Sequence, residues 1–215
     1  MNAPKPFDTL IIQFAKYPKL GQVKTRMQPV LSPEQSQKLH IKLLTHTYSE
    51  LHRLTDDTTH YRLALDVLDS HLAIDEVVKT NEPQLGKIQQ QGDSLGARML
   101  NAMEQGLREY EKVIIVGSDC PVLSKEAVNQ AILALEYAEH TFIPAEDGGY
   151  VLIGAKKIFP AIYDNMPWGT GDVLDTTKRR LELANEKAIF LDELWDVDRP
   201  EDYKRLISDK AHFEV

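Results

Sequence analysis

Apolar and polar positions along this chain alternate between two patterns. Short apolar runs such as "DTLIIQFA" (8–15), "YRLALDV" (61–67) and "KVIIVG" (112–117) are typical of buried strands. Longer segments lie between them, and their apolar residues recur every three or four positions, which is the period of an amphipathic helix. The succession of strands and helices is therefore the first property that the sequence predicts.

The longest helical pattern covers residues 32–54. Ser32 is expected to cap its amino end, Pro33 suits the first helical position, and Gln35 completes a capping box. The apolar residues of the segment fall on one stripe, which is expected to face a sheet: Leu39, Leu43, Leu51 and Leu54.

The remaining pattern continues this alternation and predicts an α/β fold. Helices are expected at 70–79, 94–110, 124–138, 172–184 and from about 200, strands at 141–145, 149–154 and 187–191, and turns in "NEPQLGKIQQQGD" (81–93). No repeat or linker interrupts the series, so we expect one domain over 1–215, with a mostly parallel mixed sheet between two helical layers. In such sheets, ligands bind at the carboxyl ends of the strands.

Composition narrows the range of partners. The 215 residues are 42% apolar and 27% charged, which suits a folded domain, and the formal net charge of -8 opposes sequence-independent binding to nucleic acid. No apolar run approaches the roughly 20 residues of a membrane helix. The first residues, "MNAPKPFDTL", show no secretion signal, and the single Cys120 cannot form an internal disulfide. We expect a cytoplasmic protein without nucleic-acid or membrane partners.

A basic loop follows the first predicted strand. The stretch "FAKYPKLGQVKTRM" (14–27) has four cations and no acid: Lys16, Lys19, Lys24 and Arg26. Gly21 would let the backbone approach a ligand closely, and Thr25 adds a hydroxyl between two cations, a combination that suits a diphosphate or triphosphate. The loop is expected to be exposed, and the alternative is an ordinary solvated basic loop.

This loop differs from the phosphate-binding loop of common ATPases and kinases. Their motif places glycine immediately before the Lys-Ser/Thr pair, whereas Val23 stands there in this chain.

Carboxylates at two further places are candidate metal ligands. Asp119 ends the strand "KVIIVG", and a carboxylate beside a polyphosphate is a natural ligand for magnesium or manganese. Asp196 and Asp198 precede the last predicted helix and are free to face the same crevice, where a second metal ligand would complete a divalent site with Asp119. The alternative for Asp119 is a turn or cap residue before Pro121.

Glycine-rich stretches supply the remaining candidates. In "QGDSLGARM" (91–99), Gly96 and Arg98 surround a helix start that would favour an anion or a base edge, and the alternative is a capped helix. In "PAEDGGYVLIG" (144–154), Asp147 offers an acceptor for hydroxyls and is a candidate catalytic residue, and its neighbours are candidate acceptor-binding residues: Glu146, Gly148 and Gly149. A tight hairpin turn would use the same glycines.

One aromatic residue has two open interpretations. Trp168 in "PWGTGD" is expected either to stack on a base or sugar or to anchor a loop.

Taken together, these stretches show a resemblance to a known family. "KYPKLGQVKTRM", "QGDSLGARM", "VGSDCPVLS", "PAEDGGYVLIG", "PWGTGDVL" and "DVDRPEDY" resemble the successive motifs of the bacterial DUF2064 family of nucleotide-diphospho-sugar-transferase-like proteins, some of them associated with arsenosugar biosynthesis. The resemblance runs from about Phe7 to Tyr203. It implies the glycosyltransferase A fold, which is shared with molybdopterin guanylyltransferase-like nucleotidyltransferases.

The resemblance also implies roles for residues. It makes Lys24 and Arg26 phosphate ligands, Asp119 a metal ligand and catalytic residue, and Asp198 a second metal ligand. The chain lacks the Gly-Gly-rich signature of the nucleotidyltransferases and the paired D-x-D of many metal-dependent glycosyltransferases, because "GSDCP" supplies one acid.

Three functions remain open at this point. The first is Mg²⁺- or Mn²⁺-dependent transfer of a sugar from a nucleotide-sugar to a small-molecule acceptor. The second is nucleotidyl transfer from a nucleoside triphosphate to a phosphorylated small molecule. The third is nucleotide binding without catalysis.

Overall fold

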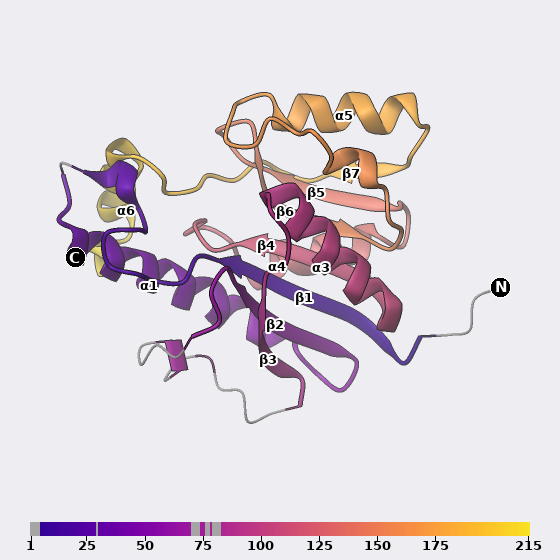
Figure 1. Cartoon of the computed structure of the whole chain (residues 1–215), viewed down its shortest axis with the longest axis horizontal. Helices are drawn as coiled ribbons and strands as arrows, with labels where there is room; N and C mark the ends of the chain where they lie inside the picture. The colour runs from indigo at the N-terminus through magenta and orange to yellow at the C-terminus, as the bar shows by residue number, and fades with distance from the viewer. Residues whose placement is uncertain (1–4, 29, 70–73, 76–77, 79–82) are drawn as a thin grey trace.

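A seven-stranded mixed sheet runs through the centre of the protein (Figure 1). The computed structural model describes residues 5–28, 30–69, 74–75, 78 and 83–215. Within them the strand order is β3-β2-β1-β4-β6-β5-β7. The strands are β1 (Phe7–Ala15), β2 (Thr59–Leu65), β3 (Leu85–Gln89), β4 (Tyr110–Gly117), β5 (His140–Pro144), β6 (Tyr150–Ala155) and β7 (Ala188–Phe190).

One strand runs against the others. β1 pairs in parallel with β2 and β4, β2 with β3, and β5 with β7, whereas β6 pairs antiparallel with both β4 and β5. The prediction of a mostly parallel mixed sheet is confirmed. Residues 145–149 join β5 to β6 as a hairpin, so the two glycines there do have the turn role that the sequence left open.

Helices cover both faces of the sheet. They are α1 (Pro33–Leu51), α3 (Leu95–Glu109), α4 (Lys125–Ala134), α5 (Val173–Leu183) and α6 (Pro200–Asp209), with short 3-10 turns at Thr25–Met27, His52–Leu54, Pro160–Ile162 and Ala211–Phe213. One apolar core joins α1 and α4 to the sheet, and a second joins α3 and α5 to its opposite face. These two cores make the three layers that the pattern predicts.

The amino end of α1 confirms its predicted cap. The Ser32 hydroxyl accepts the Gln35 backbone N–H, and the Gln35 side chain accepts the Ser32 backbone N–H. Its stripe is buried at Leu39, Leu43 and Leu51, but of these only Leu51 packs in the core shared with the sheet. Leu39 and Leu43 pack in a separate core with α6, so the expectation that they face the sheet is wrong. The pattern nevertheless located this helix correctly.

The prediction of turns at 81–93 was wrong where β3 lies. Residues 85–89 lie in the stretch interpreted as turns, yet they form an edge strand parallel to β2. Pairing with β2 outweighs the weak strand preference of Gly86 and Lys87. Most of the helix expected at 70–79 lies outside the described residues. In the described part of the chain, no helix is long and apolar enough to cross a membrane.

The C-terminal segment returns to the carboxyl edge of the sheet. Ala145 forms a parallel bridge with Leu194, and the Val197 backbone N–H donates to the Asp119 carbonyl oxygen at 2.9 Å. The two contacts hold residues 194–198 beside the ends of β4 and β5.

Candidate active site

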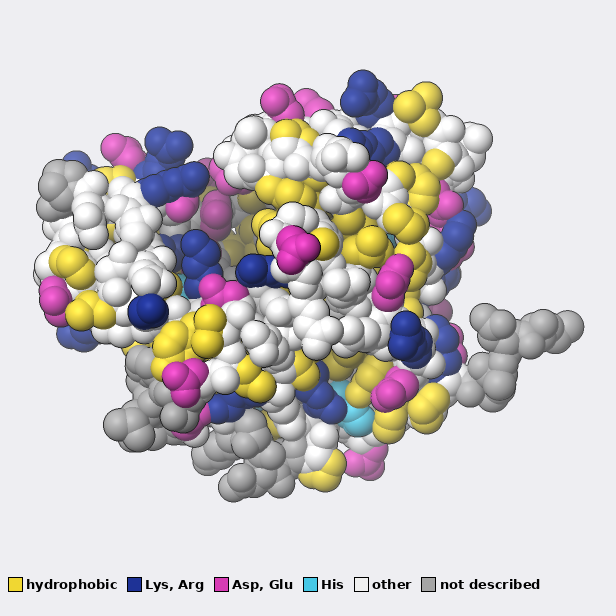
Figure 2. Space-filling view, viewed as in Figure 1, with side chains coloured by type: hydrophobic (Ala, Val, Ile, Leu, Met, Phe, Trp, Pro, Cys, Tyr) yellow, Lys and Arg dark blue, Asp and Glu magenta, His cyan; other side chains and the backbone are white. Residues whose placement is uncertain are grey.

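A cavity of about 810 Å³ opens at this edge. In the space-filling view, Lys, Arg, Asp and Glu side chains gather around the hollow (Figure 2). Ten of the candidate site residues line it: Lys16, Lys24, Thr25, Arg26, Arg98, Asp119, Asp147, Gly149, Trp168 and Asp198. Four others do not line it: Gly21, Gly96, Glu146 and Gly148. These residues come together because the carboxyl ends of parallel strands lie at one edge of the sheet.

Lys24 is held inside the cavity wall and is not a free cation. Its side chain is only 4% exposed, its Nζ lies 2.7 Å from Asp119 Oδ1, and it also donates to the carbonyl oxygen of Val197. Lys24 itself has a positive φ of 50°. The expectation of a wholly exposed loop is wrong at this residue, because its ammonium group already has a carboxylate partner.

Arg26 forms the second ion pair of the loop. Its Nη1 donates to Asp198 Oδ2, with the two side chains 59% and 40% exposed. The two candidate phosphate ligands thus form ion pairs with the two candidate metal ligands. Gly21 lies elsewhere on the loop, exposed and with a φ of +72°.

Asp119 follows a buried polar network that was not predicted from the sequence. The Ser118 hydroxyl donates to the Phe14 carbonyl oxygen at 2.9 Å and accepts the Gln13 Nε2 amide at 3.0 Å. Tyr61 completes the network by donating its hydroxyl to Gln13 Oε1 at 2.7 Å. A fully buried Gln13 in the middle of the apolar run 8–15 was the available signal. The network fixes the end of β4 against β1.

The charges around Asp119 and Asp196 differ. Desolvation alone would raise the pKa of Asp119, but the charges of Lys24, His40 and Lys16, together with the hydrogen bond from Lys24, outweigh it and hold that pKa below its ordinary value. Asp196 also lines the cavity, and desolvation together with the charges of Asp147 and Asp119 raises its pKa to about 6. Negative charge is therefore balanced at Asp119 and in excess at Asp196.

This distribution fits a divalent cation that is held only partly by protein. Among the described residues, no group of three or more His, Cys, Asp or Glu could hold a metal ion alone. Magnesium usually takes one or two carboxylates and completes its coordination with water and substrate phosphates. Asp119 and Asp196 offer hard oxygen donors, and the raised pKa of Asp196 marks charge that a cation would neutralise.

The start of α3 uses its polar groups on the chain itself. The Ser94 hydroxyl accepts the Ala97 backbone N–H at 3.1 Å, and Arg98 Nε donates to the Gly92 carbonyl oxygen at 3.0 Å. A Cβ on Gly96 would lie 2.3 Å from the Tyr163 carbonyl oxygen, so this glycine permits close packing. The capped-helix alternative thus describes this segment, although Arg98 also lines the cavity.

The loop between β5 and β6 separates its two acids. Glu146 forms a bidentate ion pair with Arg205, at 2.8 and 3.2 Å, and lines a smaller adjoining hollow of about 340 Å³. Asp147 lines both hollows, and its Oδ1 accepts the Gly149 backbone N–H at 2.9 Å. Glu146 is therefore occupied by a protein partner, whereas Asp147 faces the cavities.

Gly148 and Gly169 provide a matched pair of substitutions. Both have a positive φ, +85° and +79°, but a Cβ on Gly148 would lie 2.2 Å from the Gly171 carbonyl oxygen, and one on Gly169 would meet nothing within 4 Å. We expect Gly169→Ala to cost about 1 kcal/mol of unfolding free energy from φ alone. Gly148→Ala should cost about 1 to 3 kcal/mol more, because backbone atoms must move. Urea denaturation measures both, and equal losses would contradict the clash.

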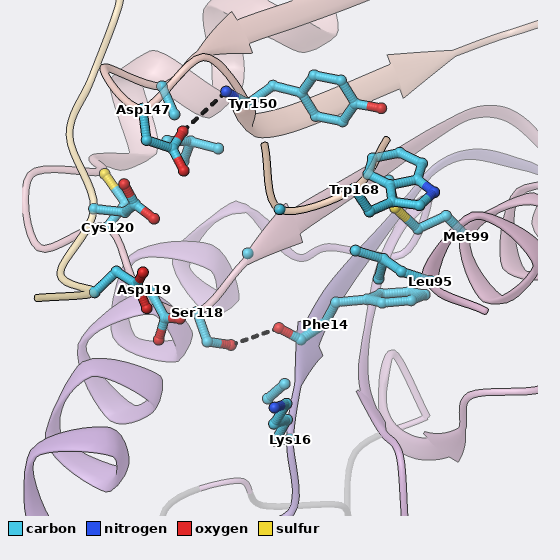
Figure 3. Close-up of a pocket in the computed structure, with 18 of the residues that line it drawn as sticks. Phe14, Lys16, Leu95, Met99, Ser118, Asp119, Cys120, Asp147, Tyr150 and Trp168 are labelled. Atoms are coloured by element: carbon cyan, nitrogen blue, oxygen red, sulfur yellow. Dashed lines mark hydrogen bonds between the residues drawn. The ribbon is translucent and has the colours of Figure 1, made fainter. Parts of the chain in front are cut away.

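The cavity has a charged half and an apolar half. In the close-up, Asp119 and Asp147 lie on one side, and Phe14, Leu95, Met99 and Trp168 lie together on the other (Figure 3). Trp168 contacts the Tyr150 ring edge-on, with ring centroids 6.0 Å apart. A ligand that fills the cavity would therefore meet ionic groups at one end and hydrocarbon at the other.

Comparison with known proteins assigns a family. Residues 51–170, over half of the chain, match the model described as "Uncharacterized protein conserved in bacteria (DUF2064)". The chain belongs to this family. The match confirms the resemblance drawn from the sequence motifs.

Two relatives of this DUF2064 protein are transferases by name. A structure from Desulfovibrio desulfuricans G20, provisionally named a nucleotide-diphospho-sugar transferase, is 29% identical, with a TM-score of 0.83 over 95% of this chain and 88% of that one. The 2-phospho-L-lactate guanylyltransferase of Methanobrevibacter smithii is 27% identical over 141 residues. That alignment spans 65% of this chain and 59% of the relative, which is less than two thirds of its length.

More distant structures share the fold of the DUF2064 protein. The 4-diphosphocytidyl-2C-methyl-D-erythritol synthase of Anaerococcus prevotii aligns over 97% of both chains at 13% identity, with a TM-score of 0.61. Rv0371c of Mycobacterium tuberculosis, solved with manganese, aligns over 94% of this chain and 98% of that chain at 14% identity, with a TM-score of 0.53. The nucleotide-diphospho-sugar transferase fold is thereby confirmed.

Proposed function

We propose that this protein is a divalent-metal-dependent transferase that takes a sugar from a nucleotide-sugar and gives it to a small-molecule acceptor. The observation that carries the proposal is the convergence of Lys24, Arg26, Asp119 and Asp196 in one cavity at the carboxyl edge. The 29% identical structure named a nucleotide-diphospho-sugar transferase supports the same choice of donor.

The ion pairs explain how a diphosphate would bind. Lys24 and Arg26 form ion pairs with Asp119 and Asp198. Asp119 and Asp198 would hold a divalent cation, and Lys24 and Arg26 would pair with phosphate oxygens, so that each of these charges would keep a partner. Lys16, Thr25 and Arg98 line the same cavity and are proposed as further nucleotide ligands. Gly21 and Gly96 act only through the shape of the backbone.

Magnesium or manganese is the proposed cofactor. Asp119 and Asp196 would hold it, and Asp198, the ligand expected from the sequence, becomes available once Arg26 turns to phosphate. A bound divalent cation would neutralise the charge that develops on the departing diphosphate. The manganese in the structure of Rv0371c, which shares the fold, supports this choice.

Asp147 is the proposed base on the acceptor side. The acceptor's hydroxyl oxygen forms a bond to the sugar's anomeric carbon while the bond from that carbon to the diphosphate oxygen breaks, and the hydroxyl proton passes to Asp147. Gly149 orients this carboxylate through its backbone N–H, and Trp168 forms the opposite wall. Gly148 shapes the loop, and Glu146 contributes by holding Arg205.

Nucleotidyl transfer is the second candidate, because the guanylyltransferase of Methanobrevibacter smithii is a relative. In that reaction an acceptor phosphate oxygen bonds to the α-phosphorus of a nucleoside triphosphate, and pyrophosphate leaves. Lys24, Arg26 and the metal would serve this chemistry equally.

Phosphorus NMR separates the candidates. The protein is incubated with Mg²⁺ and, separately, GDP-mannose, UDP-glucose, GTP or CTP, using alcohols as acceptors for the sugar donors and phosphate monoesters for the triphosphates. We expect nucleoside diphosphate from a sugar donor, and none after EDTA. Pyrophosphate from a nucleoside triphosphate, with no product from either sugar donor, would favour the second candidate. Neither product, together with no nucleotide binding by calorimetry, would contradict the proposed function.

A further inference from the structure

The apolar half of the cavity has no task in binding a diphosphate or a metal. It consists of Phe14, Leu95, Met99, Ile115, Ile153 and Trp168, all of which line the cavity and which we call the apolar hollow. Met99, Ile115 and Ile153 belong to the core between α3 and the sheet, and Phe14 and Trp168 pack against it. The core therefore opens into the cavity, and Leu95 is 45% exposed at its mouth.

We infer that the acceptor of the proposed transfer carries an apolar group, an aromatic ring or a branched hydrocarbon, which binds in the apolar hollow. That the bound molecule is the acceptor rests on the proposed function, but binding in the apolar hollow can be tested without any turnover. A polyhydroxylated acceptor would bury hydroxyls against hydrocarbon there, and unpaired polar groups are costly to bury.

The polar residues at the border of the hollow do not alter this chemistry. Gln90 Nε2 donates to the carbonyl oxygens of Ala15 and Ala64, at 3.0 and 2.8 Å. Ser94 and Arg98 bond the backbone of the α3 start, as described above. Gln90 and Ser94 are thus used in holding the chain, whereas Arg98 is bonded there only through Nε and keeps the nucleotide role proposed above. A nucleobase inserted among the apolar residues of the hollow would find few hydrogen-bond partners for its edge. An apolar group requires none.

Position also favours the acceptor over the nucleotide. Trp168, Gly149 and Tyr150 line one continuous cavity with Asp147, the proposed base. An acceptor whose ring lies in the hollow therefore has its polar end free to reach toward that carboxylate. The charged half remains for the diphosphate.

Methionine-methyl NMR tests the hollow directly. Met99 lines it, whereas Met27 lies in the separate core under α6 and serves as an internal reference. Met99→Leu assigns the first signal. We expect benzyl alcohol to shift the Met99 signal by ring current, with an affinity in the millimolar range, and to leave Met27 unmoved. Glycerol at the same concentrations should shift neither signal.

Two matched variants sharpen the test. Leu95→Gln makes the mouth of the hollow polar and should weaken benzyl alcohol binding at least about threefold. Leu133→Gln makes the same change on α4, outside the cavity, at a leucine that is 54% exposed, and should leave binding unchanged. Unchanged affinity in Leu95→Gln, or no Met99 shift in the unsubstituted protein, would overturn the inference.

Repeating the titration with a nucleotide-sugar present separates a failure of this inference from a failure of the proposed function. With Mg²⁺ and saturating GDP-mannose, benzyl alcohol should still shift Met99. If GDP-mannose itself occupies the hollow and excludes benzyl alcohol, the hollow is a donor site and the inference is wrong while the proposed function stands. If no nucleotide binds but benzyl alcohol does, the proposed function fails and the apolar site remains.

Discussion

Asp119→Asn should reduce metal-dependent turnover by about 100-fold or more, and it should also destabilise the unliganded protein. The functional loss follows from removing a charge next to developing negative charge, where single electrostatic groups contribute about 100- to 1000-fold. The loss of stability follows from Lys24, whose 4% exposed side chain would keep its charge without its carboxylate partner.

The pH dependence of this effect has a definite sign. The pKa of Asp119 is held below its ordinary value in the folded protein, so the charged carboxylate stabilises the fold at neutral pH. That contribution is lost as pH falls through the folded pKa, below about 4. We expect Asp119→Asn to cost about 1 to 2 kcal/mol at pH 7, since Asp119 is 44% exposed and water screens part of the pair.

Denaturant unfolding at pH 7 and at pH 3, with calorimetric titration of Mn²⁺ and nucleotide, measures both effects. Asp192→Asn is the control, because Asp192 is exposed in the same C-terminal segment and lines neither cavity. A variant as stable as the unsubstituted protein at pH 7 would show that the Lys24 pair contributes nothing.

Asp196→Asn should also weaken metal-dependent nucleotide binding, by about tenfold or more, while making the unliganded protein more stable. Desolvation and neighbouring carboxylates raise the pKa of Asp196 to about 6, which means that its charge opposes folding above that pH. Removing the charge removes this opposition. Functional sites often keep such destabilising groups because the ligand needs them.

The sign for Asp196 is the reverse of that for Asp119. Its folded pKa lies above the unfolded value, so the native state binds more protons between about pH 4 and pH 6, and stability falls as pH rises through this range. The gain in Asp196→Asn should be about 1 kcal/mol above pH 6 and should fade toward pH 4.

Thermal melts of the variant across this pH range, without and with Mn²⁺ plus nucleotide, are the measurement. The unsubstituted protein should gain stability from the added ligands, and Asp196→Asn should not. A variant that loses stability at pH 8, or that binds metal and nucleotide normally, would remove Asp196 from the site.

Much of the architecture could be predicted from the sequence because it depends on local signals. The capping box at Ser32 and Gln35 marked the start of α1 within one residue, and the apolar run 112–117 located β4. The carboxyl-edge rule then brought Lys24, Asp119 and Asp147 to one cavity. β3 was missed because its stability comes from pairing with β2, which a local reading of 85–89 does not contain.

The partners within the site could not be predicted, since they depend on distances between remote segments. Lys24 meets Asp119, and Arg26 meets Asp198, 172 residues later in the chain. Asp196 and Asp198 both precede the last helix in the sequence. Arg26 pairs with Asp198, whereas Asp196 has a raised pKa. Only the folded chain separates these two acids.

The long span of the Arg26–Asp198 pair has a consequence for synthesis on the ribosome. The strands β1 to β6 precede residue 156, so most of the sheet can assemble while the segment that carries Asp196 and Asp198 is still untranslated. During that interval, Lys24 lacks the Val197 carbonyl oxygen and Arg26 lacks its carboxylate. The contacts that hold Lys24 to Val197 and Arg26 to Asp198 can therefore form only after residues 197 and 198 have been synthesised, so the charged half of the cavity is completed after most of the sheet.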